Sequence, residues 1–223
     1  MSAARSAGAP PRPLLLAPMR VEELLVRAGS RRAGLPGVEV ERIGIGPVRA
    51  TAARTRLSAA LEPGRPVVLI GLGGGLRRGQ RAGDVVVASE LFALDGDETS
   101  AVPAAAELAA LLSTGGRLRV SVGPLVSSAR IVHGEDARAK AAARGALAVD
   151  MEAVWCAPLA RRHPFAVVRV LIDVPGSELA ALAKPAALLA ASRSLLACSR
   201  RIAGWVPGAS PLGTIEHVPE QKG

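Results

Sequence analysis

The stretch VVLIGLGGGL, residues 67–76, decides the fold. Its first four residues are all aliphatic, which predicts a strand that is buried on both faces. The glycines at positions 71 and 73–75 then allow unusual backbone dihedrals or the close approach of a ligand. A plain tight turn is the structural alternative. The stretch therefore predicts a buried strand whose exit is glycine-rich.

Two common nucleotide-binding motifs are excluded at this strand exit. Residue 76 is Leu, where the dinucleotide-binding fingerprint needs a third spaced glycine. The Gly-Lys-Ser/Thr sequence of a phosphate-binding P-loop does not follow either.

Apolar runs alternate with Ala-rich stretches along the rest of the chain. We expect strands over 14–18, 38–45, 67–70, 84–89, 118–126 and 166–172. We expect helices over 21–28, 48–61, 103–112, 135–143, 151–161 and 179–202. This alternation predicts an α/β fold, a single-domain three-layer sandwich around a central, mixed and twisted β-sheet. The domain is expected over 13–206, between a disordered segment at 1–12 and a flexible tail at 207–223.

The charge of the chain does not predict nucleic-acid binding. Among 223 residues there are 28 basic and 19 acidic side chains, a formal net charge of +9. All but three of the basic residues are arginines, and they are scattered in separate pairs instead of one stripe. Aromatic residues, which stack on single strands, make up only 2% of the chain. Attraction to anionic small molecules or to an anionic membrane surface stays open.

Other features bound the class of protein. The two cysteines, Cys156 and Cys198, cannot form a disulfide framework or a zinc site on their own. No His, Cys and carboxylate cluster has the spacing of a metal site. No apolar stretch is long enough for a membrane span, and the apolar run at 14–16 is too short for a secretory signal. We expect a cytoplasmic protein without a bound metal.

Charged side chains gather where the predicted strands end. Glu22 follows the first strand, Asp150 and Glu152 follow an apolar run, and Asp173 ends the strand at 166–172. Arg169 lies inside that last strand and must find a partner, because a buried charge is costly. In open α/β sheets, ligands bind at strand exits, so these side chains are candidate site residues.

These residues also have structural explanations. Glu22 and Glu23 could simply complement the positive end of a helix. Met151 could be an ordinary core residue, and Asp173 could cap a turn.

Four segments, taken in order, resemble the purine nucleoside phosphorylase/nucleosidase superfamily. That superfamily includes 5′-methylthioadenosine/S-adenosylhomocysteine nucleosidases, futalosine hydrolases and purine nucleoside phosphorylases. The segments are GIGP at 44–47, GLGGGL at 71–76 with GDVVV at 83–87, AVDME at 148–152, and RVLID at 169–173. The resemblance covers roughly residues 14–205.

Within the superfamily, the chain looks closest to the hopanoid-associated phosphorylase branch. Asp150 in VDME, PFAVVR at 164–169 and DVPGSEL at 173–179 carry this resemblance. It implies cleavage of adenosylhopane, with release of adenine. A methylthioadenosine/S-adenosylhomocysteine or futalosine nucleosidase, and a non-catalytic nucleoside-binding module, are the alternatives.

The resemblance implies a role for each carboxylate. Cleavage of an N-glycosidic bond passes through an oxocarbenium-like transition state, and protonation at N7 makes the purine a better leaving group. Asp173 would be the general acid or relay a hydrogen bond to the base. Glu22 would activate water or lie on the 5′ side, and Glu152 would bind the ribose 2′- and 3′-hydroxyls. Met151 would pack against the ribose, with Asp150 beside it.

Other positions depart from the family pattern. Gly73 and Gly74 keep the glycines that let the sugar and the nucleophile approach. Leu69 and Leu72 replace polar residues that hold phosphate in phosphorylases, which favours hydrolysis. Arg20 falls where some phosphorylases place a phosphate-binding arginine, so inorganic phosphate stays open as a co-substrate. No cofactor is implied.

The base pocket is expected to be unusually aliphatic. Ile131 stands near the family's purine-stacking Phe, and Ile172 replaces its Ser. Both changes would suit an apolar 5′ substituent, or a degenerate site.

Partners other than the nucleoside are also implied. The resemblance implies a homodimer or a higher homo-oligomer, and a lipid substrate would require peripheral contact with a membrane. A serine–histidine centre built from His133, Ser127 or Ser128 and Asp136 is a weaker alternative, since His133 more simply precedes a helix.

Overall fold

The computed structural model of the chain describes residues 10–175 and 185–208. The strands are β1 (Leu14–Ala17), β2 (Glu39–Arg42), β3 (Val67–Gly75), β4 (Val85–Ala93), β5 (Thr99–Ala101), β6 (Val120–Ser127), β7 (Ala148–Asp150) and β8 (Phe165–Asp173). The helices are α1 (Arg20–Arg31), α2 (Pro47–Ala60), α3 (Ala105–Ser113), α4 (Glu135–Ala142), α5 (Ala153–Cys156), the 3₁₀ helix η1 (Ala157–Arg161) and α6 (Pro185–Ile202).

The strands form one mixed sheet, which confirms the predicted α/β fold class. β1 pairs in parallel with both β2 and β3, and β3 pairs in parallel with β8. β8 is antiparallel to β4, β4 is parallel to β6, β6 is parallel to β7, and β7 returns antiparallel to β3. Five strands (β3, β8, β4, β6 and β7) therefore close into a ring, and β1, β2 and β5 extend from it.

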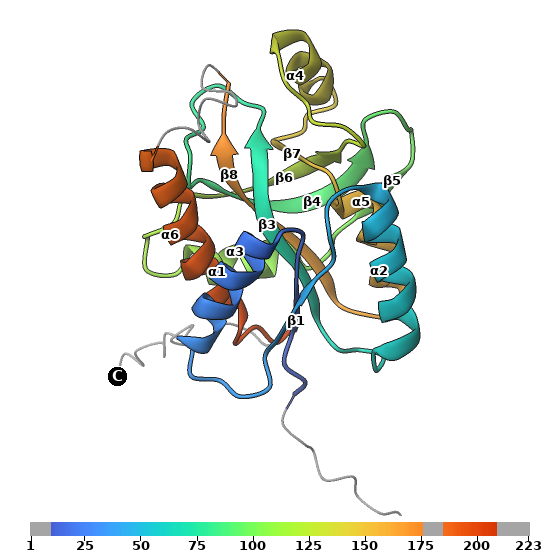
Figure 1. Cartoon of the computed structure of the whole chain (residues 1–223), viewed down its shortest axis with the longest axis vertical. Helices are drawn as coiled ribbons and strands as arrows, with labels where there is room; N and C mark the ends of the chain where they lie inside the picture. The colour runs from blue at the N-terminus through green and yellow to red at the C-terminus, as the bar shows by residue number, and fades with distance from the viewer. Residues whose placement is uncertain (1–9, 176–184, 209–223) are drawn as a thin grey trace, which may run out of the picture.

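Helices cover the sheet on two sides. α1, α3 and α6 contact one another or the strands on one side, and α2 packs with α5 on the other (Figure 1). α4 stands beyond the ends of β6 and β7. The core between the layers is aliphatic, and the first four residues of β3 are fully buried. The layered arrangement is the one that the sequence predicts.

The glycine-rich stretch continues the strand instead of ending it. β3 runs through Gly75, and none of the glycines at 71 and 73–75 has a positive φ. The alternative of a tight turn is therefore wrong. The prediction that the strand stops at residue 70 is wrong as well, because residues 71–74 keep their pairing with β8, across one register shift.

Several other boundaries differ from the prediction. The strand expected over 38–45 is confined to β2, and the short strands β5 and β7 were not predicted. The helix expected over 151–161 starts only at Ala153 and changes to a 3₁₀ helix at Ala157. The described part of the last helix, α6, runs from Pro185 to Ile202. The predictions for 1–9, 176–184 and 209–223, including the expected start of that helix at 179 and its possible break at Pro185, lie outside the described residues.

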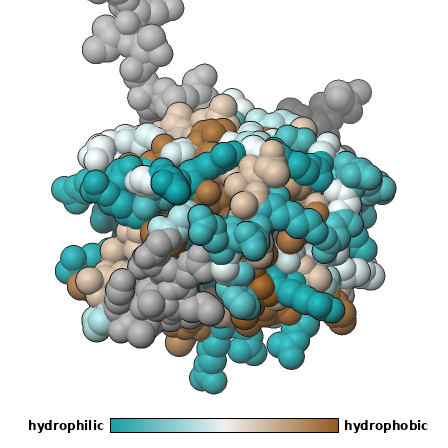
Figure 2. Space-filling model, turned by 90° about the horizontal axis from the view of Figure 1, so that it is seen from above, coloured by the Kyte–Doolittle hydropathy of each residue, from teal (hydrophilic) through white to brown (hydrophobic). Residues whose placement is uncertain are grey.

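The surface onto which β3 and β8 point is mixed in character. In Figure 2, small hydrophobic areas lie between larger hydrophilic ones. Among the helices of the described ranges, none has the length and apolar character that a membrane crossing requires.

A close helix–helix contact fixes the position of α1. A β-carbon added at Gly29 would lie 2.5 Å from the Leu196 carbonyl oxygen and 2.8 Å from Ser199 Cβ, both on α6. The absence of a side chain at Gly29 lets the two helices approach. Because α1 also carries Glu22, this contact bears on the site described next.

We predict that Gly29→Ala lowers the free energy of unfolding by about 1–3 kcal/mol, since the new methyl group must push α1 away from backbone atoms of α6. Urea denaturation measures the loss. Gly96→Ala is the matched control, because its β-carbon would meet only Ala93 Cβ, at an ordinary 3.4 Å. Equal stability of the two variants would contradict this account of the helix contact.

Candidate functional site

A pocket of about 300 Å³ lies at the carboxyl ends of β3 and β8. It brings together every predicted site residue except Arg20. Its charged residues are Glu22, Arg130, Asp150, Glu152 and Asp173. The remaining lining is apolar or glycine: Pro18, Met19, Ile45, Leu72, Gly73, Gly74, Ile131, Val132, Val149, Met151 and Ile172.

Glu22 is fixed by two backbone amides. Its Oε2 accepts a hydrogen bond from Met19 N at 2.7 Å, and its Oε1 accepts one from Leu72 N at 2.6 Å. The first bond caps α1, so the structural explanation for Glu22 holds alongside its place in the pocket. Burial raises the pKa of Glu22 above its usual value, opposed by the Leu72 hydrogen bond and the charge of Arg169. Each oxygen keeps a lone pair for a further donor.

Gly71 makes this position of Glu22 possible. A β-carbon on Gly71 would lie 2.7 Å from Glu22 Oε1 and 2.8 Å from Arg169 Nη1. The glycine therefore serves close approach of two charged side chains, in a strand whose φ values are ordinary.

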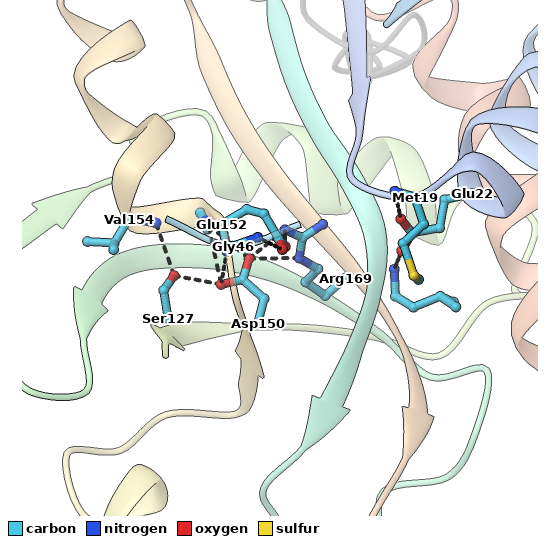
Figure 3. Close-up of polar contacts among 10 residues, drawn as sticks. Met19, Glu22, Gly46, Ser127, Asp150, Glu152, Val154 and Arg169 are labelled. Carbon is cyan, nitrogen blue, oxygen red and sulfur yellow. Dashed lines mark hydrogen bonds and ion pairs between the residues drawn. The ribbon is translucent and has the colours of Figure 1, made fainter. Parts of the chain in front are cut away.

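Arg169 finds the partner that its place in β8 requires. The side chain is 0% exposed, and its Nε and Nη2 donate to Asp150 Oδ2 at 2.9 and 2.5 Å (Figure 3). Asp150 Oδ1 also accepts from Ser127 Oγ at 2.6 Å, and the carboxylate caps α5 through Ala153 N. Both oxygens of Asp150 thus accept hydrogen bonds from other residues of the protein, although Asp150 borders the pocket. Its observed bonds hold Arg169 in place.

Glu152 stands at the junction of this network and the pocket. Its Oε2 accepts from Arg169 Nη2 at 3.2 Å, and its Oε1 accepts from Gly46 N at 3.0 Å (Figure 3). Burial raises the pKa of Glu152 to about 7, and the charge of Arg169 opposes the rise. The carboxylate is 4% exposed, so a ligand in the pocket would meet it in a nearly dry environment.

Asp173 is held by a residue that the sequence reasoning missed. Arg138 of α4 donates from Nη2 to Asp173 Oδ2 at 2.6 Å and from Nη1 to the Gly75 carbonyl oxygen at 2.6 Å. The two bonds of Arg138 fix the position of the Asp173 carboxyl group at the end of β8. Arg138 and Ala141, three residues apart, are the buried residues of α4, and the charged, Ala-rich sequence of this helix gave no signal of that.

The apolar residues that line the pocket differ in how far they are exposed to solvent. Ile172 is buried at the end of β8, while Ile131 is 65% exposed at the rim. Leu72 lines the pocket and donates its backbone amide to Glu22, while its side chain packs against the hydrophobic core. A flat apolar ligand could therefore lie between aliphatic groups here.

Arg20 lies outside this pocket. It borders a second cavity, of about 400 Å³, that shares Pro18, Met19 and Ile45 with the pocket. The two cavities are neighbours, but Arg20 lines only the second one and does not join the other predicted site residues in the pocket.

The serine–histidine alternative finds no support in the hydrogen bonds. Ser127 Oγ donates to Asp150 and accepts from Val154 N at 3.0 Å. Ser128 Oγ accepts from Arg130 N at 3.2 Å. The Ser127 hydroxyl thus pairs with Asp150 of β7 and Val154 of α5, and the Ser128 hydroxyl pairs with a backbone amide two residues away.

The arrangement suits a ligand with a polyol next to a flat base. Glu152 can accept from hydroxyl groups, Asp173 can bind a ring nitrogen or an amino group, and Glu22 can orient a small nucleophile. The aliphatic wall would hold the base.

Comparison with known proteins agrees with the fold. The family model described as "Phosphorylase superfamily" matches residues 32–200. Among curated protein sequences, none matches the chain.

Solved structures with this fold include several nucleosidases. A 5′-methylthioadenosine/S-adenosylhomocysteine nucleosidase from Neisseria meningitidis, in complex with methylthio-immucillin-A, aligns with a TM-score of 0.72 at 22% identity and covers 85% of this chain and 97% of its own. A putative enzyme of the same name from Borrelia burgdorferi, bound to adenine, aligns at 0.68 and 17%, covering 85% and 98%. A futalosine hydrolase mutant from Helicobacter pylori aligns at 0.65 and 18%, covering 84% and 97%. At these identities the likeness shows the fold.

We predict that Arg169→Met lowers the free energy of unfolding by about 3–5 kcal/mol, because the carboxylates of Asp150 and Glu152 would stay buried without their counter-charge. Arg56→Met is the control: Arg56 pairs with Glu41 at the surface, and its loss should cost within about 1 kcal/mol. Urea denaturation at neutral and acidic pH measures both.

The difference between the two variants should shrink as the pH falls, since protonation removes the uncompensated charges. Similar losses in both variants at neutral pH would contradict the central place of Arg169.

Proposed function

Because the chain belongs to the phosphorylase superfamily, we propose that it is an enzyme that cleaves the N-glycosidic bond of a 5′-substituted adenine nucleoside and releases adenine. One observation carries the proposal. Glu22, Glu152 and Asp173 come from separate parts of the chain and meet at one small, largely apolar pocket. Titratable groups with raised pKa values in a cleft are typical of an active site, and Glu22 and Glu152 have them.

Glu152 is the proposed ribose ligand. In its ionised form it would accept hydrogen bonds from the 2′- and 3′-hydroxyls and stabilise the positive charge that develops on the sugar. Arg169 and Gly46 N hold the carboxylate from behind, which leaves its remaining lone pairs for the diol. Met151, partly exposed in the pocket, would pack against the sugar.

Asp173 is the proposed base ligand. It would protonate N7 as a general acid or relay a hydrogen bond to it, and its ion pair with Arg138 fixes the position of the carboxyl group. As a relay it would accept a hydrogen bond from N7–H once N7 has taken a proton from solvent water, and so stabilise the leaving base. Ile131, Val132 and Ile172 would contact the faces of the purine.

Glu22 is the proposed residue that orients the nucleophile. Its two backbone hydrogen bonds fix the carboxylate, and a water bound to a free lone pair could give up its proton to it. We favour water over phosphate, because Leu69 and Leu72 offer no side-chain donors and Arg20 lies in the neighbouring cavity. The reaction proposed here needs no cofactor.

The aliphatic pocket suits a nucleoside whose 5′ substituent begins with an apolar group. Adenosylhopane is the substrate that the motif resemblance favours. Methylthioadenosine, S-adenosylhomocysteine and futalosine-type nucleosides are the alternatives. A nucleoside-binding module without turnover would have the same geometry.

The proposal extends to a partner surface. Val21 and Leu24 of α1 and Val48 of α2 are 54%, 58% and 81% exposed, and both helices begin beside the pocket. Apolar groups of this size favour burial against a second copy of the chain, or against a membrane that holds a lipid substrate.

We predict that the protein releases free adenine from 5′-methylthioadenosine or from adenosylhopane without added phosphate, and that Asp173→Asn lowers kcat by about 10² or more. Chromatography of adenine and of the sugar product measures both, and a ribose 1-phosphate product with phosphate present would identify phosphorolysis.

Adenine binding without turnover of any 5′-substituted adenosine would contradict the enzyme and support the binding module. An unchanged rate in Asp173→Asn would remove Asp173 from the proposed role. Asp136→Asn, at an exposed position of α4, is the control and should leave the rate unchanged.

A further inference from the structure

The second cavity, next to the carboxylate pocket, is lined by three arginines. Arg20 begins α1, Arg42 ends β2, and Arg49 lies in the first turn of α2. The cavity measures about 400 Å³, and none of the described residues that line it is a carboxylate. Three guanidinium groups around one cavity form a surface that would attract an anion.

These arginines are not engaged in strong pairs within the protein. Over residues 10–175 and 185–208, no carboxylate lies within ion-pair distance of Arg20 or Arg49. Arg42 has one long contact, 3.9 Å from its Nε to Glu23 Oε2, and Glu23 is shared with Arg27 at 2.9 Å. The cluster therefore keeps its charge and most of its hydrogen-bond donors for a ligand.

One turn connects the arginines to the proposed ribose site. A β-carbon on Gly44 would lie 2.5 Å from Arg49 Cδ, so the Arg49 side chain lies directly across the turn. Two residues later, Gly46 N donates to Glu152 Oε1. The turn at 44–46 thus has Arg49 on one side and the ribose-binding carboxylate on the other.

The position of the shared wall indicates which end of a nucleoside would face the arginines. With the base at Asp173 and the ribose hydroxyls at Glu152, the remaining end of the pocket is formed by Pro18, Met19 and Ile45. The same three residues border the arginine cavity. A group attached at the 5′ carbon would therefore pass over an apolar wall and reach the arginines.

We propose that Arg20, Arg42 and Arg49 form an oxyanion subsite that binds a carboxylate or phosphate group at the end of the substrate's 5′ substituent. The inference rests on the proposed function, and it narrows the substrate to a nucleoside whose 5′ group is apolar near the sugar and anionic at its end. A 5′ group that is hydrocarbon throughout, as in adenosylhopane, would leave the three arginines without a ligand.

The same oxyanion chemistry could come from free inorganic phosphate. The experiment therefore compares two matched substrates and titrates phosphate as a separate arm. The substrates are 5′-S-(3-carboxypropyl)-5′-thioadenosine and its carboxamide, which have nearly the same shape and differ in charge.

For wild type we expect a kcat/KM for the carboxylate about tenfold above that for the carboxamide. In Arg42→Gln/Arg49→Gln this ratio should fall to about one to two, because exposed charge pairs contribute roughly fivefold or less each. Arg31→Gln, at the opposite end of α1, removes one exposed charge and should keep the wild-type ratio. Thermal denaturation checks that the exposed substitutions leave the fold intact.

Each outcome decides the proposal. A carboxylate-to-carboxamide ratio of kcat/KM that falls in the double variant but not in Arg31→Gln supports an anion carried by the substrate. A phosphate effect on the carboxamide substrate that disappears in the same variant keeps the subsite and assigns it to free phosphate, which overturns the 5′ assignment. Equal ratios in all variants, with no phosphate effect, overturn the subsite.

Failure of the proposed function is distinguishable from failure of the subsite. If wild type cleaves neither compound, calorimetric binding of the same pair replaces turnover. A carboxylate preference in binding that needs Arg42 and Arg49 would then support the subsite, and equal binding of the two compounds would overturn it.

Discussion

The fully buried guanidinium of Arg169 lies between Asp150 and Glu152, and the site depends on this interaction. Removing three charges from water is costly, so the cluster is tolerable only because nearly every oxygen has a donor. Asp150 takes the shorter bonds, and Glu152 keeps a longer one, at 3.2 Å. The second carboxylate is thereby positioned, yet its capacity to accept further hydrogen bonds is not exhausted.

The backbone is shaped around that cluster. β3 carries glycines where Arg169 and Glu22 approach it, and the strand closure through β7 places Asp150 beside β8. The turn before α2 then closes the site, because Gly46 N reaches Glu152 from a segment 106 residues earlier. The buried charge of Arg169 is thus linked, through its carboxylate partners, to the sheet, to the starts of α2 and α5, and to the pocket.

Much of this arrangement was predictable from residue types alone. Aliphatic runs predicted the long strands. Carboxylates at predicted strand exits pointed to Glu22 and Asp173, and the position after an apolar run pointed to Glu152. The sequence could not show that the glycines continue β3, since extended and turn conformations are equally open to glycine. It also could not show β7, whose three residues pair only through tertiary contacts. Arg138 was missed because its partner, Asp173, is 35 residues away and the helix around it is polar.

The most direct test concerns the claim that Glu152, held by Arg169, binds the ribose diol. The measurement is kcat/KM for a 5′-thioether of adenosine and for its 2′-deoxy analogue, in wild type and in Glu152→Gln. The account predicts a loss of about 10² or more for the deoxy analogue in wild type, because a charge-assisted bond is removed, and a loss of only a few-fold in the variant. The same ratio in both proteins would contradict it.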